Sequence, residues 1–311
     1  MASNEQRGKD ALKNLERELN SRDRKEKRGP WGIAALSAVV ILGIGSGIYA
    51  LANHNDADTS TSAEESASTS SSPSPIDAEP LSLTRAKALP ETVTCSYPRG
   101  DAGQSKDVGT PPTDSVSARG TVTVNLDTSA GPIGMELDRS VSPCTVNSIE
   151  YLAKKDYFND TVCHRLTTSE GLKVLQCGDP TGSGSGGPGF TFANEYPTDE
   201  ALEKVDTSQI PEGTPADQAE QMKGQLLQSP PPVKYGRGTI AMANAGLGTN
   251  GSQFFLNYGD STLPPMYTYF GKIDDKGLDT LDKIAEKGAE GGKSDGKPAE
   301  EVKIEAATVA G

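Results

Sequence analysis

Two stretches of the chain combine residue types that suit the binding of an extended peptide. The first runs from Ala241 to Phe255 and reads AMANAGLGTNGSQFF. Its small-residue loop has almost no side-chain bulk, so another backbone can approach it closely. At its end, Gln253 supplies an amide and Phe255 an aromatic surface. The second stretch supplies a cation at Arg165 and another amide at Gln176. Together these groups predict a site that seats one apolar ring of a peptide.

The same stretches resemble the cyclophilin family of peptidyl-prolyl cis-trans isomerases. The family's patterns are F-H-R at the start of a strand, Q-G-G-D after the next strand, and M-A-N-A-G…T-N-G-S-Q-F-F. Here they read CHR at 163–165, QCGD at 176–179, and a nearly intact long signature at 242–255. The resemblance continues through 270–273 and covers roughly residues 118–310. The long signature is very specific, whereas HR or QxGD alone would mean little.

The resemblance implies that the reaction is rotation about an Xaa–Pro bond. Amide resonance sets a barrier of about 18–20 kcal/mol, and the uncatalysed exchange takes tens of seconds or more. No bond is made or broken, so no nucleophile, metal or cofactor is expected. The matching arginine, Arg165, would donate toward the prolyl nitrogen. A guanidinium suits this role because it presents fixed donors and stays charged.

The other residues of the implied site hold the peptide. Gln176 and Gln253 can both donate and accept hydrogen bonds, and the main chain of Asn244 would pair with the residue before proline. The resemblance also implies a set of substrate-binding residues around the proline ring and along the small-residue loop: Phe255, Val174, Leu263, Ala243, Ala245 and Tyr267. Phe254 would point the opposite way along the strand, into the core.

Several positions depart from the family pattern. The segment between the arginine and the first glutamine is longer than in compact members, so Lys173 stands at or near the place of a pocket phenylalanine. Leu263 or Thr262 stands where many members carry a tryptophan that contacts cyclosporin. We therefore predict weak cyclosporin binding, which submicromolar inhibition of turnover would contradict. These departures keep an alternative open: a cyclophilin-like binding module or holdase that grips proline-containing segments without useful turnover.

Other chemistries fit the sequence poorly. The only histidines are His54 and His164, and no nucleophile-elbow motif accompanies them. The Gly-rich segment 181–189 lacks the Lys-Ser/Thr that ends a phosphate-binding P-loop. No close Cys-x-x-Cys pair is present, so no metal site is expected. The net charge of −13 makes nucleic acid a poor partner and favours peptide or protein partners.

The elements that must position these residues are mainly β. Alternating segments that begin at Thr121 and Ile133 flank a Gly-containing turn and predict a hairpin. Ser142-Pro143 is a typical helix start, and a second helix is predicted at 278–287. Alternation over 300–309 predicts a last strand. Taken with the resemblance, this order implies a closed antiparallel eight-stranded cyclophilin-like barrel capped by two helices.

The N-terminal part of the chain predicts export. A run of 22 residues without charge is long enough to cross a bilayer, and the basic cluster before it places the N-terminus in the cytoplasm. The competing interpretation is a signal peptide cleaved near Ala52, which would release a secreted protein. The partners would then be proline-containing peptides and unfolded exported proteins. The predicted divisions are a charged segment at 1–30, a transmembrane helix at 31–52, a disordered Ser/Thr-rich spacer at 53–80, an extended lead-in at 81–117, and an isomerase domain at 118–311 with an insertion at 195–236.

Four cysteines all follow the predicted span. An even number of cysteines in an oxidising compartment favours disulfides, with three possible connectivities. Cys163 precedes one predicted strand and Cys177 ends the next, so they would face each other if those strands pair. We therefore favour Cys163–Cys177, which leaves Cys95–Cys144; four reduced thiols are the alternative.

Overall fold

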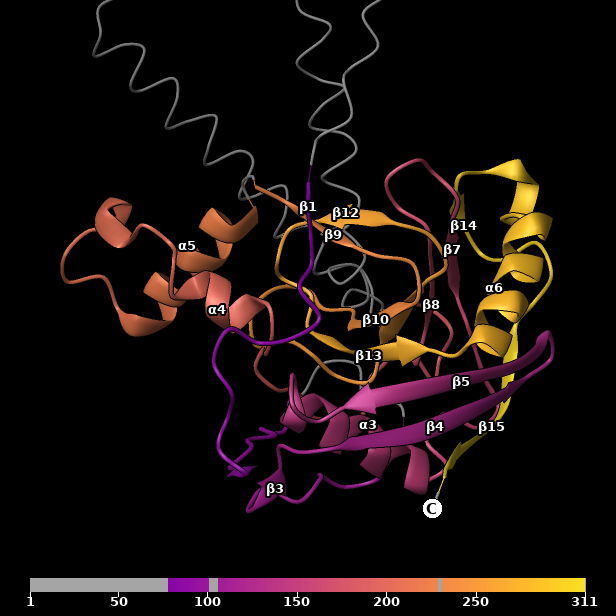
Figure 1. Ribbon diagram of the computed structural model, residues 1–311, viewed down its shortest axis with the longest axis horizontal. Helices are drawn as coiled ribbons and strands as arrows, with labels where there is room; N and C mark the ends of the chain where they lie inside the picture. The colour runs from indigo at the N-terminus through magenta and orange to yellow at the C-terminus, as the bar shows by residue number, and fades with distance from the viewer. Residues whose placement is uncertain (1–77, 101–105, 229–230, 311) are drawn as a thin grey trace, which may run out of the picture.

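An antiparallel sheet of ten strands forms the centre of the molecule in the computed structural model, which describes residues 78–100, 106–228 and 231–310 (Figure 1). The strand order is β14-β7-β8-β11-β10-β13-β5-β4-β15-β6. In chain order these strands are β4 (Thr121–Thr128), β5 (Gly131–Asp138), β6 (Thr161–Val162), β7 (Arg165–Thr167), β8 (Val174–Cys177), β10 (Thr239–Met242), β11 (Phe254–Asn257), β13 (Tyr269–Ile273), β14 (Asp295–Gly296) and β15 (Lys303–Val309). The fold is mainly β, as predicted.

The sheet differs from the predicted closed barrel of eight strands. It has ten strands, and the hydrogen-bonded order among the described strands is linear. One stretch of chain nevertheless connects the two sides of the sheet, because β6 is the last strand at one end and β7 is the second strand from the other. Cys163 and His164 separate β6 from β7. Regular strand pairing is interrupted at these two residues. Before them the chain pairs with β15, and after them it pairs with β8.

The predicted hairpin is formed by β4 and β5, which pair over eight residues each. Its turn depends on Gly131, whose φ is +131°. A Cβ at this position would lie 2.9 Å from Thr280 Oγ1. Glycine therefore lets the turn pack closely against the helix that carries Thr280.

Two helices pack on the sheet at the predicted places: α3 (Pro143–Lys154) and α6 (Asp275–Lys287). Asp274 caps α6 by accepting a hydrogen bond from Gly277 N at 2.7 Å. The cap of α3 differs from the prediction, since the Ser142 hydroxyl donates to Tyr269 O instead. The carboxylate of Glu195 accepts from the first backbone N–H groups of α3, which otherwise have no intrahelical partner.

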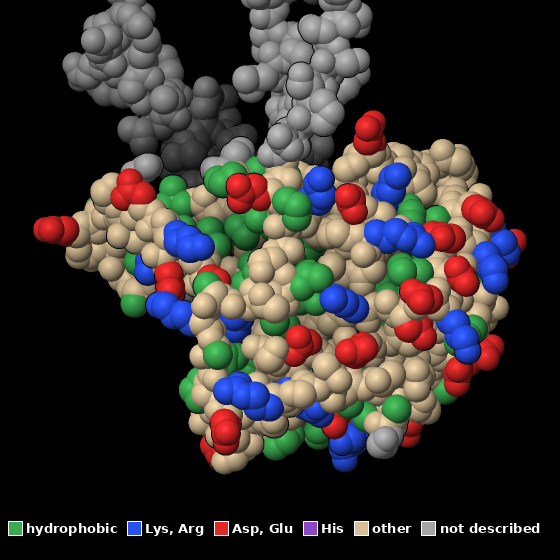
Figure 2. Space-filling view, viewed as in Figure 1, with side chains coloured by type: hydrophobic (Ala, Val, Ile, Leu, Met, Phe, Trp, Pro, Cys, Tyr) green, Lys and Arg blue, Asp and Glu red, His purple; other side chains and the backbone are tan. Residues whose placement is uncertain are grey.

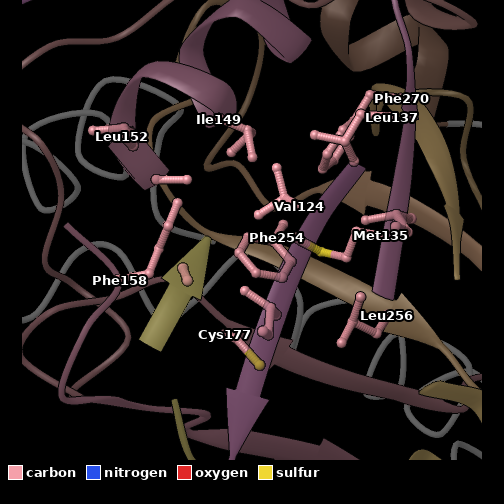
Figure 3. Close-up of a cluster of buried hydrophobic side chains, with 14 of the residues drawn as sticks. Val124, Met135, Leu137, Ile149, Leu152, Phe158, Cys177, Phe254, Leu256 and Phe270 are labelled. Atoms are coloured by element: carbon pink, nitrogen blue, oxygen red, sulfur yellow. The ribbon is translucent and has the colours of Figure 1, made fainter. Parts of the chain in front are cut away.

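The main hydrophobic core lies between α3 and the sheet (Figure 3). Phe254 from β11 contacts Phe158 edge to face, with ring centroids 5.7 Å apart. Ile149 and Leu152 from α3 are fully buried against the same cluster. Burial of this kind stabilises the fold by about 25 cal/mol for each Å² of apolar surface removed from water.

A second, smaller sheet lies beside the main one and contains β1 (Glu79–Pro80), β9 (Val233–Tyr235) and β12 (Ser261–Leu263) in the order β1-β9-β12. β1 pairs with β9 in parallel, so the last two residues of the predicted spacer form a strand. The insertion provides α4 (Thr198–Leu202), a 3-10 turn η1 (Thr207–Gln209) and α5 (Ala216–Gln228).

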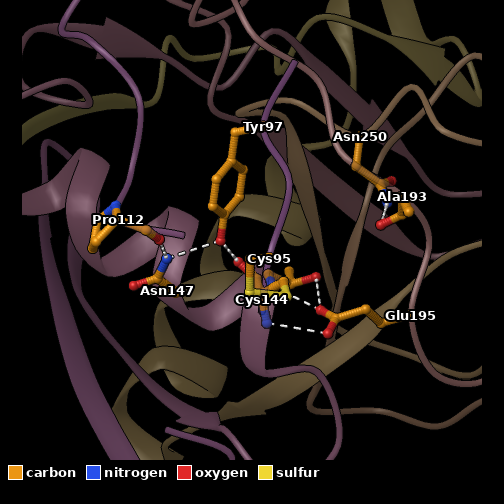
Figure 4. The surroundings of a disulfide bond; sticks show 9 residues. Cys95, Tyr97, Pro112, Cys144, Asn147, Ala193, Glu195 and Asn250 are labelled. Carbon is orange, nitrogen blue, oxygen red and sulfur yellow. Dashed lines mark hydrogen bonds between the residues drawn. A yellow bond between two sulfur atoms is a disulfide. The ribbon is translucent and has the colours of Figure 1, made fainter. Parts of the chain in front are cut away.

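The lead-in packs against α3 (Figure 4). Cys95 forms a disulfide with Cys144 in the first turn of α3, with Cα atoms 5.5 Å apart. The Tyr97 hydroxyl donates to Cys144 O at 2.7 Å and accepts from Asn147 Nδ2 at 2.8 Å. The short strands β2 (Thr92–Val93) and β3 (Val116–Ser117) pair within the same region.

A 3-10 turn η2 (Glu290–Gly292) follows α6 near the C-terminus.

Within the described ranges, no helix combines the length and the apolar character needed to cross a membrane. The predicted transmembrane helix at 31–52 and most of the predicted spacer lie outside these ranges. Both remain predictions.

Candidate functional site

Strand register brings the predicted cation, one amide and the pocket aromatic into one row. Arg165 in β7 pairs with Gln176 in β8, and Gln176 pairs with Phe255 in β11. Directly paired residues of an antiparallel ladder point to the same face of a sheet. Three side chains from distant parts of the sequence therefore lie next to one another on the face opposite to the main core.

The guanidinium of Arg165 is held by Asp295 from β14. Arg165 Nε donates to Asp295 Oδ1 at 2.8 Å, and Nη2 donates to Oδ2 at 2.6 Å. The arginine side chain is 17% exposed, so it is mostly covered yet still reaches the surface. Burial raises the pKa of Tyr267, and the charge of Arg165 acts in the opposite direction, so the guanidinium lies within electrostatic range of this ring.

The two predicted glutamines form one hydrogen-bonded unit. Gln176 Nε2 donates to Gln253 Oε1 at 2.9 Å. Gln253 Nε2 then donates to the carbonyl oxygens of Gly184 and Gly186, at 2.9 and 3.0 Å. These contacts fix both amide groups, so the orientation of Gln176 depends on the Gly-rich loop.

The Gly-rich loop is shaped by a carboxylate of its own chain. Asp179 accepts hydrogen bonds from Thr181 and from Gly184 N. Burial tends to raise the pKa of Asp179, but the hydrogen bonds from Thr181, Gly186 and Gly184 outweigh it, and the pKa lies below its ordinary value. A Cβ at Gly186 would lie 2.0 Å from Asp179 Oδ1, so glycine is required there. The loop's N–H groups thus bind a carboxylate of the protein.

The predicted pocket residues belong to a second hydrophobic cluster, separate from the main core. The Phe255 ring contacts Tyr267 edge to face, with centroids 5.6 Å apart, and Tyr235 at 6.4 Å. The Tyr235 hydroxyl donates to Tyr267 O at 2.8 Å, which fixes the segment that carries this ring. The cluster also contains Val174, Ala243 and Leu263, together with Leu227 from the insertion helix α5.

The small-residue loop leaves a stretch of main chain without partners. The Asn244 side chain donates to Met266 O at 2.9 Å and accepts from Gly246 N, which holds the loop in place. The main-chain N–H and C=O of Asn244 make no hydrogen bond to another described residue. Ala245 is exposed beside them. This arrangement suits an added peptide strand, which needs one donor and one acceptor at each paired residue.

His164 is partly buried beside Arg165, and this burial lowers its pKa. Asp179 opposes this shift in the pKa, while the charge of Arg165 adds to it. Of the ring nitrogens, Nδ1 has no hydrogen-bond partner among the described residues. No serine–histidine pair is therefore in place at this nitrogen.

The predicted disulfide connectivity is confirmed. Cys163, which lies between β6 and β7, is bonded to Cys177 at the end of β8, with Cα atoms 4.0 Å apart, and Cys95 is bonded to Cys144. Cys163 lies two residues before Arg165, and Cys177 directly follows Gln176. The bond lies on the core face of the two strands that carry these site residues on their other face.

Sequence reasoning missed Asp295, Asp179 and Tyr235. Asp295 is 130 residues from Arg165 along the chain, and it lies in a short polar segment, Ser294-Asp295-Gly296-Lys297, that carries no signal of a site. Asp179 was part of a quoted motif, but its hydrogen bonds to the loop follow only from the folded geometry. Tyr235 lies inside the insertion, where the pattern indicated no particular contact.

The site as a whole combines a fixed cation, two amides, an apolar ring cluster and free main-chain groups. Acidic and basic side chains are interspersed over the face shown in Figure 2, without a broad area of one sign. The site thus has the features expected of the class of proteins that bind extended peptides.

Comparisons with known proteins agree with this class. The family model of cyclophilin type peptidyl-prolyl cis-trans isomerases matches residues 122–309, and the chain belongs to this family. A probable peptidyl-prolyl cis-trans isomerase B of Mycobacterium tuberculosis is 49% identical over 211 residues, which cover 68% of this chain and 62% of that protein. The corresponding Mycobacterium leprae protein is 50% identical over 218 residues, covering 68% and 65%. The matched region therefore spans less than two thirds of these relatives.

Among solved structures, a Cryptosporidium parvum cyclophilin type peptidyl-prolyl cis-trans isomerase is 26% identical. The match covers 62% of this chain and 99% of that one, with a TM-score of 0.43.

Proposed function

We propose that this chain accelerates cis-trans rotation about Xaa–Pro bonds in peptides and in unfolded exported proteins. The observation that carries the proposal is the row formed by Arg165, Gln176 and Phe255 across three paired strands. This row puts a permanent cation and an amide next to the ring cluster that would seat proline. Family membership supports the same activity.

The physical demand on such a site is differential binding. As the Xaa–Pro bond twists, the amide loses resonance and its nitrogen becomes more basic. To gain about five decades in rate, the site must bind the twisted amide about 7 kcal/mol more tightly than the planar one. Interactions that strengthen only in the twisted state must supply this difference.

Arg165 would supply the main part of it. A guanidinium has five N–H donors, and Asp295 occupies only one on Nε and one on Nη2. The remaining donors can approach the prolyl nitrogen, which accepts a hydrogen bond only after it leaves the planar state. Because these donors are already oriented, little reorganisation is needed as the bond twists.

The other residues would hold the substrate while one side of the bond rotates. The free main-chain groups of Asn244 would pair with the residue before proline. The cluster around Phe255 would hold the ring on the other side. Gln176, fixed through Gln253, would bind a substrate carbonyl or N–H with its remaining capacity. Anchoring both sides lets binding energy be used on the twist between them.

A protease-coupled proline-peptide assay on the full chain tests this proposal. Arg165→Ala should lower kcat/KM by about 10²- to 10³-fold, the range seen when one oriented donor is removed from an active site. Arg237→Ala is the control, because Arg237 also pairs with an aspartate, Asp282, outside the row. A wild-type rate equal to that of Arg165→Ala at background would overturn the proposal. Peptide binding without acceleration would then identify a binding module.

We also propose that residues 31–52 anchor the chain in a membrane with the isomerase domain on the outer side. The uncharged run and its basic flank support this placement, and both disulfides suit an oxidising compartment. In cells of the native host, the protein should stay in the membrane fraction and be open to added protease at the outer surface. A released chain that begins after Ala52 would instead establish a cleaved signal peptide.

A further inference from the structure

Asp295 lies in the same row as the site residues, on the far side of Arg165 from Gln176. In β14, Asp295 pairs with Thr167 of β7. Arg165 is two residues before Thr167 on the same strand, so it shares the face of Asp295 and is its diagonal neighbour. The row therefore runs over four strands, with the carboxylate at one end and Phe255 at the other.

The contact between Asp295 and Arg165 uses one edge of the guanidinium. Nε and Nη2 donate to the two carboxylate oxygens at 2.8 and 2.6 Å. Neither Nε nor Nη2 of Arg165 makes another hydrogen bond to a described residue. A bidentate pair fixes the plane of the guanidinium as well as its position. Without this contact, the long arginine side chain would regain rotamers that do not face the ring cluster.

We propose that Asp295 is a positioning residue for the isomerase reaction: it holds the Arg165 guanidinium so that its free donors face the twisting amide. This inference rests on the proposed function. Asp295 touches the reacting atoms only through Arg165, so its removal should lower kcat and leave KM almost unchanged. If the carboxylate instead merely weakened the positive charge, its removal would raise the rate. The sign of the effect separates the two roles.

The test compares Asp295→Ala and Asp295→Glu with the wild type, each also in an Arg165→Ala background. Asp295→Ala should lower kcat by about ten- to a hundredfold, because small misplacements of a reacting group have effects of that size. Asp295→Glu should recover part of the rate. In the Arg165→Ala background, Asp295→Ala should cause no further loss, since residues that act as a unit are not additive.

Asp282→Ala is the matched control. It breaks a second bidentate pair, in which Arg237 Nη1 and Nη2 donate to Asp282 at 2.8 Å each, and it should leave kcat unchanged. An unchanged or raised kcat in Asp295→Ala would overturn the proposal, as would a further loss in the Arg165→Ala background.

A second measurement does not depend on turnover. In ¹H–¹⁵N spectra, the Arg165 Nε–H signal, assigned with Arg165→Lys, should be sharp in the wild type and lost or averaged in Asp295→Ala. If the wild type fails to accelerate rotation, the proposed function fails. The Nε–H signal still decides whether Asp295 holds the guanidinium, and a freely averaging signal in the wild type would overturn that assignment.

Discussion

The two faces of strand β11 differ in what their side chains do, although the residues are adjacent in the chain. Phe254 points into the main core, where it contacts Phe158 (Figure 3). Phe255 points into the second cluster, where it contacts Tyr267. Both rings are almost completely buried, with 0% and 4% exposure. Burial alone therefore does not distinguish a structural aromatic from a site aromatic.

The neighbours across the ladder make the distinction. Phe254 pairs with Cys177, which is bonded to Cys163 within the core. Phe255 pairs with Gln176, which connects to Gln253 and to Arg165. One face of these strands thus carries covalent and apolar contacts, and the other carries polar groups that have capacity left for a ligand. We expect substitutions of buried side chains on either face to lower stability, and only those on the second face to lower turnover as well.

The sharpest test of this division is the pair Phe254→Ala and Phe255→Ala. Removing a buried phenylalanine typically costs about 3–5 kcal/mol of stability, so both variants should unfold more easily in urea. Only Phe255→Ala should lower kcat/KM per folded molecule. Activity is measured at low temperature and scaled to the folded fraction from circular dichroism. An equal loss of activity in both variants would erase the distinction between the faces.

Removal of the core-face disulfide is the next largest effect. The double variant Cys163→Ala/Cys177→Ala should lose about 3 kcal/mol, as expected for a closed loop of about 15 residues. The folded protein should keep kcat/KM close to that of the wild type, because the β7–β8 pairing remains. Urea denaturation and the protease-coupled assay measure the two quantities. A large loss of kcat/KM in the folded variant would show that the bond also positions the site.

Gln253→Leu tests the polar face. It leaves the carbonyl groups of Gly184 and Gly186 without their donor, and it removes the acceptor of Gln176 Nε2. We expect kcat/KM to fall about tenfold, which corresponds to about 1.4 kcal/mol and to the loss of one hydrogen bond to the substrate. Thermal unfolding should change little. Gln225→Leu, on the insertion helix α5, is an exposed control.

The smallest effect concerns pH. Burial lowers the pKa of His164 in the folded protein, so the unfolded chain takes up a proton first as pH falls below about 6.5. The stability that depends on neutral His164 is present above this pH and is lost below it, by at most about 1.4 kcal/mol per pH unit. The Tm should therefore fall from pH 7.5 to pH 5.5. His164→Asn should flatten this part of the profile, and an unchanged slope would contradict the assignment.

The sequence was sufficient for features that depend on local pattern. The hairpin at β4 and β5, both helix positions, the opposite directions of Phe254 and Phe255, and the two disulfides followed from spacing, periodicity and the family resemblance. Each has a signal within a few residues of the element. Arg165, Gln176 and Phe255 also proved to be ladder neighbours, because β7 pairs with β8 and β8 pairs with β11.

Features that depend on distant partners were not predictable. Nothing near Asp295 indicates that it meets Arg165, and nothing near Glu195 indicates that it caps α3. Ser142 has the right residue type for the cap, but its hydroxyl donates to Tyr269 O, and Glu195 accepts from the helix N–H groups in its place. The parallel pairing of β1 with β9 was missed for the same reason, since a two-residue strand has no periodicity.

The disulfide between Cys95 and Cys144 has a consequence for any attempt to prepare the cyclophilin-type domain alone (Figure 4). The family match begins at residue 122, but one half of this bond lies before it. A fragment cut at that boundary would carry an odd cysteine in the first turn of α3 and would lose the Tyr97 hydroxyl that covers it. Such a fragment should dimerise on oxidation through Cys144, whereas one that begins at residue 78 should remain a monomer.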